Sequence, residues 1–139
     1  MSLPSGQDVA QAMDVTPLKD EELKVGKATT RAEYEALPLL TDFDDEFIGN
    51  APLWYYILAE AQNDWYQKLV NANAGPDDGP DTPVQLGDVG SRIVVETLVG
   101  ILLDDGHSVL RQAPGWVPAI GKQKDFDMPD FIKYALQLE

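Results

Sequence analysis

The sequence predicts an all-α fold: a compact bundle of two long antiparallel helices, at about 53–70 and 88–103, with shorter helices and long loops. Neither stretch contains proline, and each is longer than an ordinary strand. Between them, residues 74–83 concentrate proline, glycine and aspartate, which no regular element tolerates. Because a short connection favours antiparallel neighbours, we expect the two helices to pack against each other across this loop.

Before residue 27 the chain predicts one helix and one isolated turn. Ser5 is a suitable N-cap, and Thr16-Pro17 ends the helix because proline lacks an amide proton and disfavours helical geometry in its predecessor. A turn of helix follows at Asp20–Val25 and is closed by Gly26. The apolar face of the first helix is predicted to comprise Val9, Ala12 and Met13.

Residues 30–48 predict a short capped helix followed by an acidic segment. Thr30 with Glu33 three residues later is the pattern of a capping box, and Pro38 stops a helix over Arg31–Leu37. The segment Thr41–Ile48 mixes acidic with aromatic residues and is either a helical turn or a loop.

The first long helix, over about 53–70, has one apolar stripe. Its polar residues, Glu60 and Asn63 among them, fall mostly elsewhere on the helical wheel, so we expect them outside the packed face. The stripe consists of Trp54, Ile57, Leu58, Ala61, Trp65 and Leu69.

The second long helix, over about 88–103, is apolar around most of its circumference and should be the central, most buried helix. Its β-branched residues would also suit a strand, but its length favours a helix. We expect Val94 to be buried there, so that Val94→Asp unfolds the domain. Asp104-Asp105-Gly106 ends the helix.

The C-terminal part predicts a short turn from Ser108, a loop and a terminal helix. The loop Pro114–Pro118 carries Trp116, which we expect to be buried. Asp127 or Pro129 opens the helix, since proline suits the first helical position. Its inward-facing residues are predicted to be Phe131, Ile132, Tyr134, Ala135 and Leu138.

Composition bounds the class of protein. The 139 residues suit a single domain over 1–139, and 44% hydrophobic content is typical of a globular protein. A formal net charge of −14 predicts no nucleic acid and no anionic membrane as partner, because both bind basic patches. The charge serves solubility or a docking surface for a basic partner. There is no apolar run of about 18 residues, no signal-peptide pattern in residues 1–15 and no cysteine, so the localisation stays open.

The chain has one histidine, His107, which is the candidate imidazole for haem or a transition metal. It follows the end of a predicted helix without apolar neighbours, so we interpret it as a solvent-facing loop residue. Two acidic groups are likewise interpreted as solvated, the first because its spacing fails the calcium-binding EF-hand pattern and the second because a run of charges usually forms a solvated face. They are Asp77, Asp78 and Asp81 in one loop, and Asp42, Asp44, Asp45 and Glu46 in another segment.

Two further pairs of residues suggest catalysis but have structural interpretations. Arg92 and Glu96 are four apart and predict an ion pair or a backbone contact rather than an acid–base pair. Neither Ser5 nor Ser91 has the Gly-x-Ser-x-Gly spacing of a nucleophile elbow.

Two patterns suggest planar or nucleotide ligands. Gly87 and Gly90 match half of a dinucleotide fingerprint, but no predicted strand precedes them. A group of aromatic residues would suit stacking on a planar ligand, although a core with an interface stripe is commoner, and an exposed part would mark a docking surface. These residues are Trp54, Tyr55, Tyr56, Trp65 and Tyr66.

Several segments, in order along the chain, carry a resemblance to a known family. They are firmest at Pro52–Gln62 and Leu86–Leu103, and the others are Leu3–Gln7, Thr16–Leu18, Pro114–Pro118 and Phe126–Phe131. Together they resemble the C-terminal region of bacterial haem peroxidases of the animal, myeloperoxidase-like, type. The resemblance implies an almost wholly α-helical fold and, for the parent family, oxidation of substrates by peroxide at a haem.

The resemblance also implies where that chemistry lies. In the family a proximal histidine paired with an asparagine holds the iron, and a distal histidine and arginine assist peroxide cleavage. These motifs are expected before Leu3, so no residue here is assigned a catalytic, cofactor-binding or metal-binding role. We expect a subdomain without catalytic activity of its own, and with no haem bound by this chain alone.

Uncovered apolar surface is the remaining functional expectation. A subdomain of a larger helical protein leaves such surface exposed, which predicts a homo-oligomer or a protein partner. The alternative is an acidic helical interaction module, or a self-associating protein, with no enzymatic role. A small, complete haem or metal enzyme is disfavoured by the single histidine.

Overall fold

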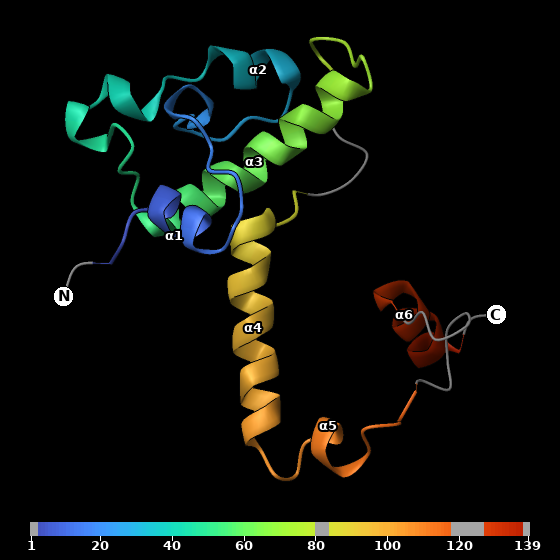
Figure 1. The fold of residues 1–139 in the computed structure, drawn as a ribbon. Helices are drawn as coiled ribbons and strands as arrows, with labels where there is room; N and C mark the ends of the chain where they lie inside the picture. The colour runs from blue at the N-terminus through green and yellow to red at the C-terminus, as the bar shows by residue number, and fades with distance from the viewer. Residues whose placement is uncertain (1–2, 80–83, 118–126, 138–139) are drawn as a thin grey trace. The chain divides into compact units, whose positions relative to one another are not determined.

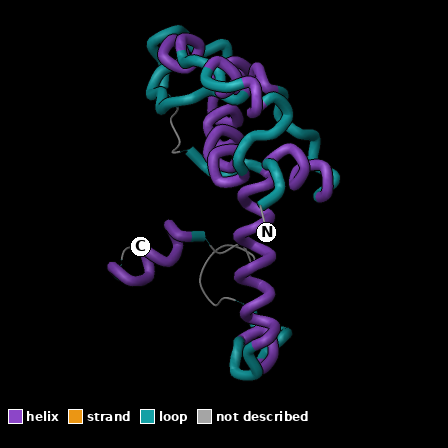
Figure 2. Tube along the Cα trace, turned by 90° about the vertical axis from the view of Figure 1, so that its left-hand side faces the viewer, coloured by secondary structure: helices purple, strands orange, loops and turns teal. Residues whose placement is uncertain are grey.

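The computed structural model describes residues 3–79, 84–117 and 127–137. This part of the chain contains helices and loops and no strand, which confirms the all-α class (Figure 2). Two isolated antiparallel bridges, Ser5 with Pro52 and Lys24 with Leu39, join segments outside the helices' interiors. Contacts divide the chain into two compact units, residues 1–96 and 97–139, so the single domain over 1–139 stays a prediction.

The first unit consists of short helical elements packed on one long helix. That helix, α3, runs over Leu53–Asn71, and both α1 and α2 pack against it (Figure 1). The second long helix, α4, runs over Asp88–Asp104 and crosses the boundary between the units. The shorter elements are α1 (Gly6–Ala12), η1 (Asp20–Glu22), α2 (Arg31–Ala36), η2 (Leu40–Asp42), η3 (Asp45–Phe47), α5 (Val109–Gln112) and α6 (Met128–Leu136).

Helix α1 starts where its sequence predicts and ends earlier. The Ser5 hydroxyl accepts a hydrogen bond of 3.1 Å from the Asp8 amide, which confirms the N-cap. The helix stops at Ala12, ahead of the expected Pro17, because Asp14 takes a left-handed backbone conformation with φ of 57°. Aspartate tolerates that conformation better than most residues, so a local turn ends the helix before the proline does.

Helix α2 receives caps from two parts of the chain. The Thr30 hydroxyl accepts from the Glu33 amide at 3.2 Å, as predicted, while the Glu33 carboxylate accepts from the Thr29 amide at 2.8 Å. The backbone carbonyls of Asp78 and Pro76 accept from the first two amides of α2. The described part of the loop after α3 therefore completes the start of α2. The acidic segment after α2 forms two short 3₁₀ turns, η2 and η3.

Tyr56 on α3 is the centre of the main core. Its side chain is fully buried, and its hydroxyl accepts a hydrogen bond of 2.9 Å from the Leu18 amide. A Cβ at Gly6 would overlap the Tyr56 side chain, so α1 approaches α3 at a distance that only glycine allows. The other buried members are Ala10, Leu23, Leu40, Ala51, Ala59 and Val89.

The face of α3 that packs differs from the predicted stripe. Trp54 and Leu58 are exposed, by 69% and 60%, although the helical wheel placed them inside. Glu60 and Asn63 are each only 5% exposed, although the wheel placed them outside. The prediction was wrong at these positions because the elements that surround α3 supply polar partners to its buried face.

Helix α4 has the predicted extent but not the predicted burial. Its buried residues are Val89 and Gly90, both in its first turn, and Val94 is 44% exposed. Within residues 1–96, the long helices meet at the start of α4, where Glu60 of α3 contacts the Val89 and Gly90 amides. The expectation that α4 is the most buried helix is therefore wrong.

The second unit also exposes residues that were predicted to be buried. Trp116 is 61% exposed, so the expectation that it is buried is wrong. In α6 the predicted N-cap is confirmed, since the Asp127 side chain accepts from the Asp130 amide at 2.9 Å. The side chains predicted to face inward on that helix are nevertheless exposed, namely Phe131, Ile132, Tyr134 and Ala135. Leu138 lies outside the described residues.

We predict opposite results for two aspartate substitutions on α4. Val89→Asp should destabilise the first unit by about 3–5 kcal/mol, because it buries a charge beside another carboxylate. Val94→Asp should change the free energy of unfolding by less than about 0.5 kcal/mol, because Val94 is already in contact with solvent. Urea unfolding followed by circular dichroism measures both. Equal losses in the two variants would show that α4 is buried beyond its first turn.

Candidate functional site

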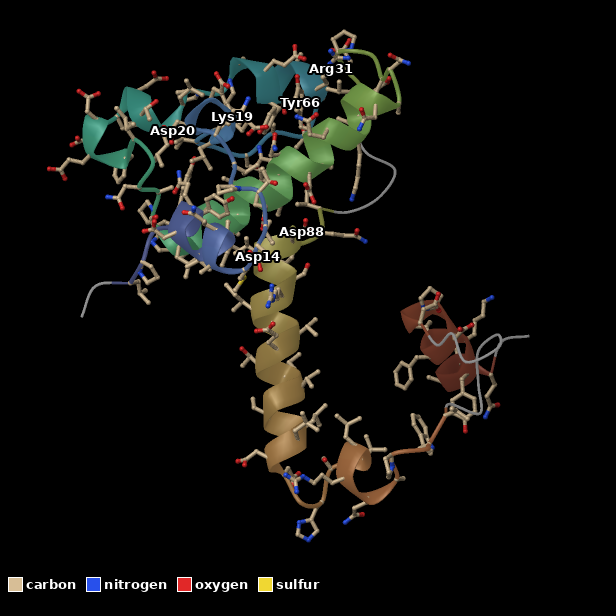
Figure 3. The ribbon with its side chains drawn as sticks, viewed as in Figure 1. Asp14, Lys19, Asp20, Arg31, Tyr66 and Asp88 are labelled. Atoms are coloured by element: carbon tan, nitrogen blue, oxygen red, sulfur yellow. The ribbon has the colours of Figure 1, made fainter. Side chains whose placement is uncertain are left out.

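Helices α3 and α4 meet at the start of α4. Glu60 of α3 reaches this turn, and its carboxylate accepts from the Val89 amide at 3.1 and 3.2 Å and from the Gly90 amide at 3.2 Å. Figure 3 labels Asp88, the first residue of α4, at this junction. The first amides of any α-helix have no partner within the helix. A side chain from α3 therefore supplies the N-terminal cap of α4.

Two glycines make the approach of the two helices possible. A Cβ at Gly87 would overlap the Glu60 side chain, and a Cβ at Gly90 would lie 2.8 Å from Cγ2 of Ile57. Both contacts are closer than carbon atoms in proteins tolerate. The half-fingerprint seen in the sequence thus has a packing role, with α3 and not a nucleotide against the glycines.

Glu60 is held in an environment that disfavours its charge. Burial raises its pKa, and the nearby carboxylates of Asp64 and Asp88 raise it further, while the two amide hydrogen bonds act in the opposite direction. Within the described ranges, no lysine, arginine or histidine forms an ion pair with it. Glu60 is not among the residues that the sequence predicted for a site, although it is the one carboxylate within the otherwise apolar run 53–61.

Arg92 attaches the second turn of α4 to the end of α1. Its Nη1 donates to the Met13 carbonyl at 2.7 Å, and its Nε donates to Glu96 at 2.7 Å. The predicted ion pair is confirmed, but both side chains are about half exposed, 48% and 61%. An exposed pair of this kind contributes little stability and offers no buried acid–base group.

The rest of α4 presents a broad apolar surface, which we call the α4 arc. At 100° per residue its side chains cover about 200° of the helix, about twice the stripe of an ordinary surface helix. Each member is between 39% and 61% exposed. The members are Val94, Val95, Leu98, Val99, Ile101, Leu102 and Leu103.

A polar cleft of about 200 Å³ lies between η1, α2 and α3. The rings of Tyr34 and Tyr66 stack there with centroids 4.4 Å apart. Glu35 accepts from the Tyr66 hydroxyl at 3.0 Å and from Arg31 Nε at 2.9 Å, contacts that lower its pKa (Figure 3 labels Arg31 and Tyr66). Lys24 Nζ donates to carbonyls at the end of α2. These charged groups already have partners within the protein, which favours a structural role for the cleft.

The aromatic cluster is mostly core, as predicted. Tyr56 and Trp65 are buried, and Trp54 is the exposed member, beside an apolar cleft of about 340 Å³ at the start of α3. The Tyr55 hydroxyl and the Trp65 indole nitrogen are buried without a hydrogen bond among the described residues. Burial raises the pKa of Tyr55 to about 12.

His107 does not fit a haem site. Its side chain is 92% exposed, and its Nδ1 lies 3.8 Å from the Asp105 carboxylate, which confirms the predicted loop position. A proximal haem ligand must present its imidazole into an apolar pocket. The described residues offer no such environment around His107.

The remaining candidate residues support local backbone structure. Ser5 caps α1, and the Ser91 hydroxyl donates to the Leu86 carbonyl at 3.0 Å. The Asp78 carboxylate accepts from the Gly75 amide at 2.6 Å. Asp77 is exposed, and Asp81 lies outside the described residues.

The acidic segment before α3 is solvated, as predicted. Its exposed carboxylates cap short turns: Asp42 accepts from the Leu39 amide and Asp44 from the Glu46 amide. Asp45 is also exposed. In the described part of the chain, no three acidic or histidine side chains converge in a way that would hold a metal ion.

Comparison of the chain with protein-family models, with curated proteins and with solved structures finds no match. None of the helices described here has the length and apolar character needed to cross a membrane. The features of the chain that could serve a function are therefore the Glu60 junction and the α4 arc.

We predict that Gly87→Ala destabilises the first unit by about 1–3 kcal/mol, because the added methyl group displaces the Glu60 side chain from its amide partners. Gly100→Ala is the matched control, since a Cβ there meets no atom within 4 Å. It should leave stability unchanged or raise it by about 0.5–1 kcal/mol, the helix-propensity gain of alanine over glycine. Thermal and urea unfolding compare the two. A harmless Gly87→Ala would contradict the close packing at the junction.

Proposed function

We propose that this chain is the C-terminal subdomain of a protein of the animal haem-peroxidase type. We further propose that its role is to pack against other protein through the α4 arc, without catalysing a reaction itself. The observation that carries the proposal is the exposure of this arc on a helix whose first turn is firmly attached. The proposed relationship to the peroxidases rests on the sequence resemblance, which is firmest at Pro52–Gln62 and Leu86–Leu103.

The free energy available from covering the arc favours association. Burying the exposed half of each aliphatic side chain contributes about 1 kcal/mol. Across the arc this reaches several kcal/mol before the entropic cost of association is subtracted. An arc of about 200° also faces more than one direction, which favours a partner that surrounds the helix over a single flat surface.

The proposed lack of catalysis is supported by the chain's own side chains. The family's iron ligand is a histidine, and His107 is exposed in a loop. Haem propionates usually pair with arginine or lysine, whereas acidic residues outnumber basic ones here by 24 to 10. The described residues thus offer neither an imidazole in an apolar pocket nor a basic rim.

A second candidate is an independent acidic module that associates with itself and has no enzymatic relationship. The α4 arc favours this function too, since two copies would cover each other's apolar side chains. The net charge of −14 opposes it at low ionic strength, because like-charged copies repel each other. Salt should therefore strengthen self-association and affect an oppositely charged partner in the reverse sense.

We predict that the isolated chain does not bind haem specifically. A haem titration followed in the Soret region should give no saturable one-to-one spectrum, and guaiacol oxidation by peroxide should stay at the level of free haem. His107→Ala should behave like the wild type in both assays. A saturable spectrum that disappears in His107→Ala would contradict the proposal and favour a complete haem protein.

We predict that the α4 arc makes the isolated chain associate in a concentration-dependent way. Sedimentation should show species larger than the monomer at high protein concentration, more so in high salt. The double variant Leu98→Asp/Ile101→Asp should be monomeric under the same conditions. Val84→Asp is the matched control: Val84 is 52% exposed but lies outside α4, so its replacement should leave association intact. A wild-type chain that stays monomeric throughout would count against both candidate functions.

A further inference from the structure

Glu60 combines three properties that rarely occur together in a structural carboxylate. It is 5% exposed, it contacts two backbone amides of another helix, and no cation among the described residues pairs with it. A buried charge without a counter-ion is costly, whereas the neutral acid avoids most of that cost. The protonation state of this residue therefore affects how firmly α4 is attached to α3.

The geometry allows the neutral acid to keep the amide contacts. Oε2 of Glu60 lies 3.2 Å from the Val89 amide and 3.2 Å from the Gly90 amide. As the carbonyl oxygen of a protonated carboxyl group, Oε2 accepts both hydrogen bonds with its two lone pairs. The proton then resides on Oε1, so protonation removes the buried charge and leaves the cap of α4 in place.

We propose that Glu60 is a proton-dependent latch, whose neutral form holds the start of α4 on α3 and whose ionisation loosens that junction. The latch goes beyond the proposed function and does not depend on it, because it concerns the attachment of α4 and not what covers the α4 arc. The results of the haem titration and of the sedimentation experiment therefore neither support nor contradict the latch.

The charged groups around Glu60 act in the same direction. Asp64 on α3 and Asp88 on α4 both disfavour a further negative charge. Tyr56, one turn earlier on α3, is buried with its hydroxyl bonded to the Leu18 amide, and Glu22 of η1 acts on that tyrosine. Arg92 on α4 directs its guanidinium to the Met13 carbonyl and to Glu96. No described lysine, arginine or histidine thus pairs with the ionised latch, and burial outweighs the partial positive charge of the first α4 amides.

The sign of the pH dependence follows from linkage. Because burial raises the pKa of Glu60 in the closed junction, the closed form binds the proton more tightly than the open form. The latch is firmest below the ordinary pKa of a glutamate, about 4.3, and weakens as the pH rises through the higher pKa of the closed form. The opening equilibrium changes by at most about tenfold for each pH unit in this window.

The test measures hydrogen-exchange protection of the Val89 and Gly90 amides by NMR across this pH range, together with the titration of the Glu60 carboxyl carbon. In the native chain, protection should fall by up to about tenfold per pH unit as Glu60 ionises. In Glu60→Gln, a neutral isostere that keeps the carbonyl oxygen, the fall should disappear. The Gly6 amide, which donates to the Ala51 carbonyl at 2.8 Å, reports any change in the whole unit.

A second variant keeps the test decisive if Glu60→Gln does not fold. Asp64→Asn removes one neighbouring charge at an exposed position and should shift the midpoint of the Glu60 titration to lower pH. Titration of Glu60 at or below the ordinary value would overturn the latch. So would a protection profile at Val89 and Gly90 that is the same in the native chain and in Glu60→Gln.

Discussion

The need to satisfy the first amides of α4 is the constraint on which the arrangement of the long helices depends. These amides have no partner within their own helix, and water is excluded where Val89 is fully buried. Glu60 supplies the acceptor from α3, and Gly87 and Gly90 leave the space for it. Together they fix the start of α4 on the middle of α3, while the side chains of the α4 arc are exposed.

The first unit achieves its packing through contacts between distant parts of the chain. Gly6 packs closely against the Tyr56 side chain, and the Leu18 amide donates to the Tyr56 hydroxyl. These two contacts hold α1 and the segment after it on α3. In the second half of α3, Asn63 accepts a hydrogen bond of 3.2 Å from the hydroxyl of Tyr34 on α2. A single long helix thus organises several short elements, none of which is long enough to be stable alone.

The acidic character of the chain has a local use as well as a global one. Several carboxylates accept hydrogen bonds from backbone amides at the starts of short helices or turns, including those of Glu22, Glu33, Asp42, Asp44 and Asp127. Short elements expose a large share of unpaired amides, and carboxylates near helix starts also suit the helix dipole. This use accounts for part of the net charge of −14 without a basic partner or a metal.

The sequence by itself determined the all-α class, the extents of both long helices and most caps, because Ser5, Thr30 and Asp127 act on amides only three residues away. Tertiary structure decided which faces are buried. Glu60 faces inward, where it accepts from the first amides of α4, and in the second turn of α4 Ile93 packs against the core while Val94 is exposed. Helical periodicity shows that a face is apolar, but whether the face is buried depends on packing against elements distant in sequence. The same long-range packing forms the Glu60 junction.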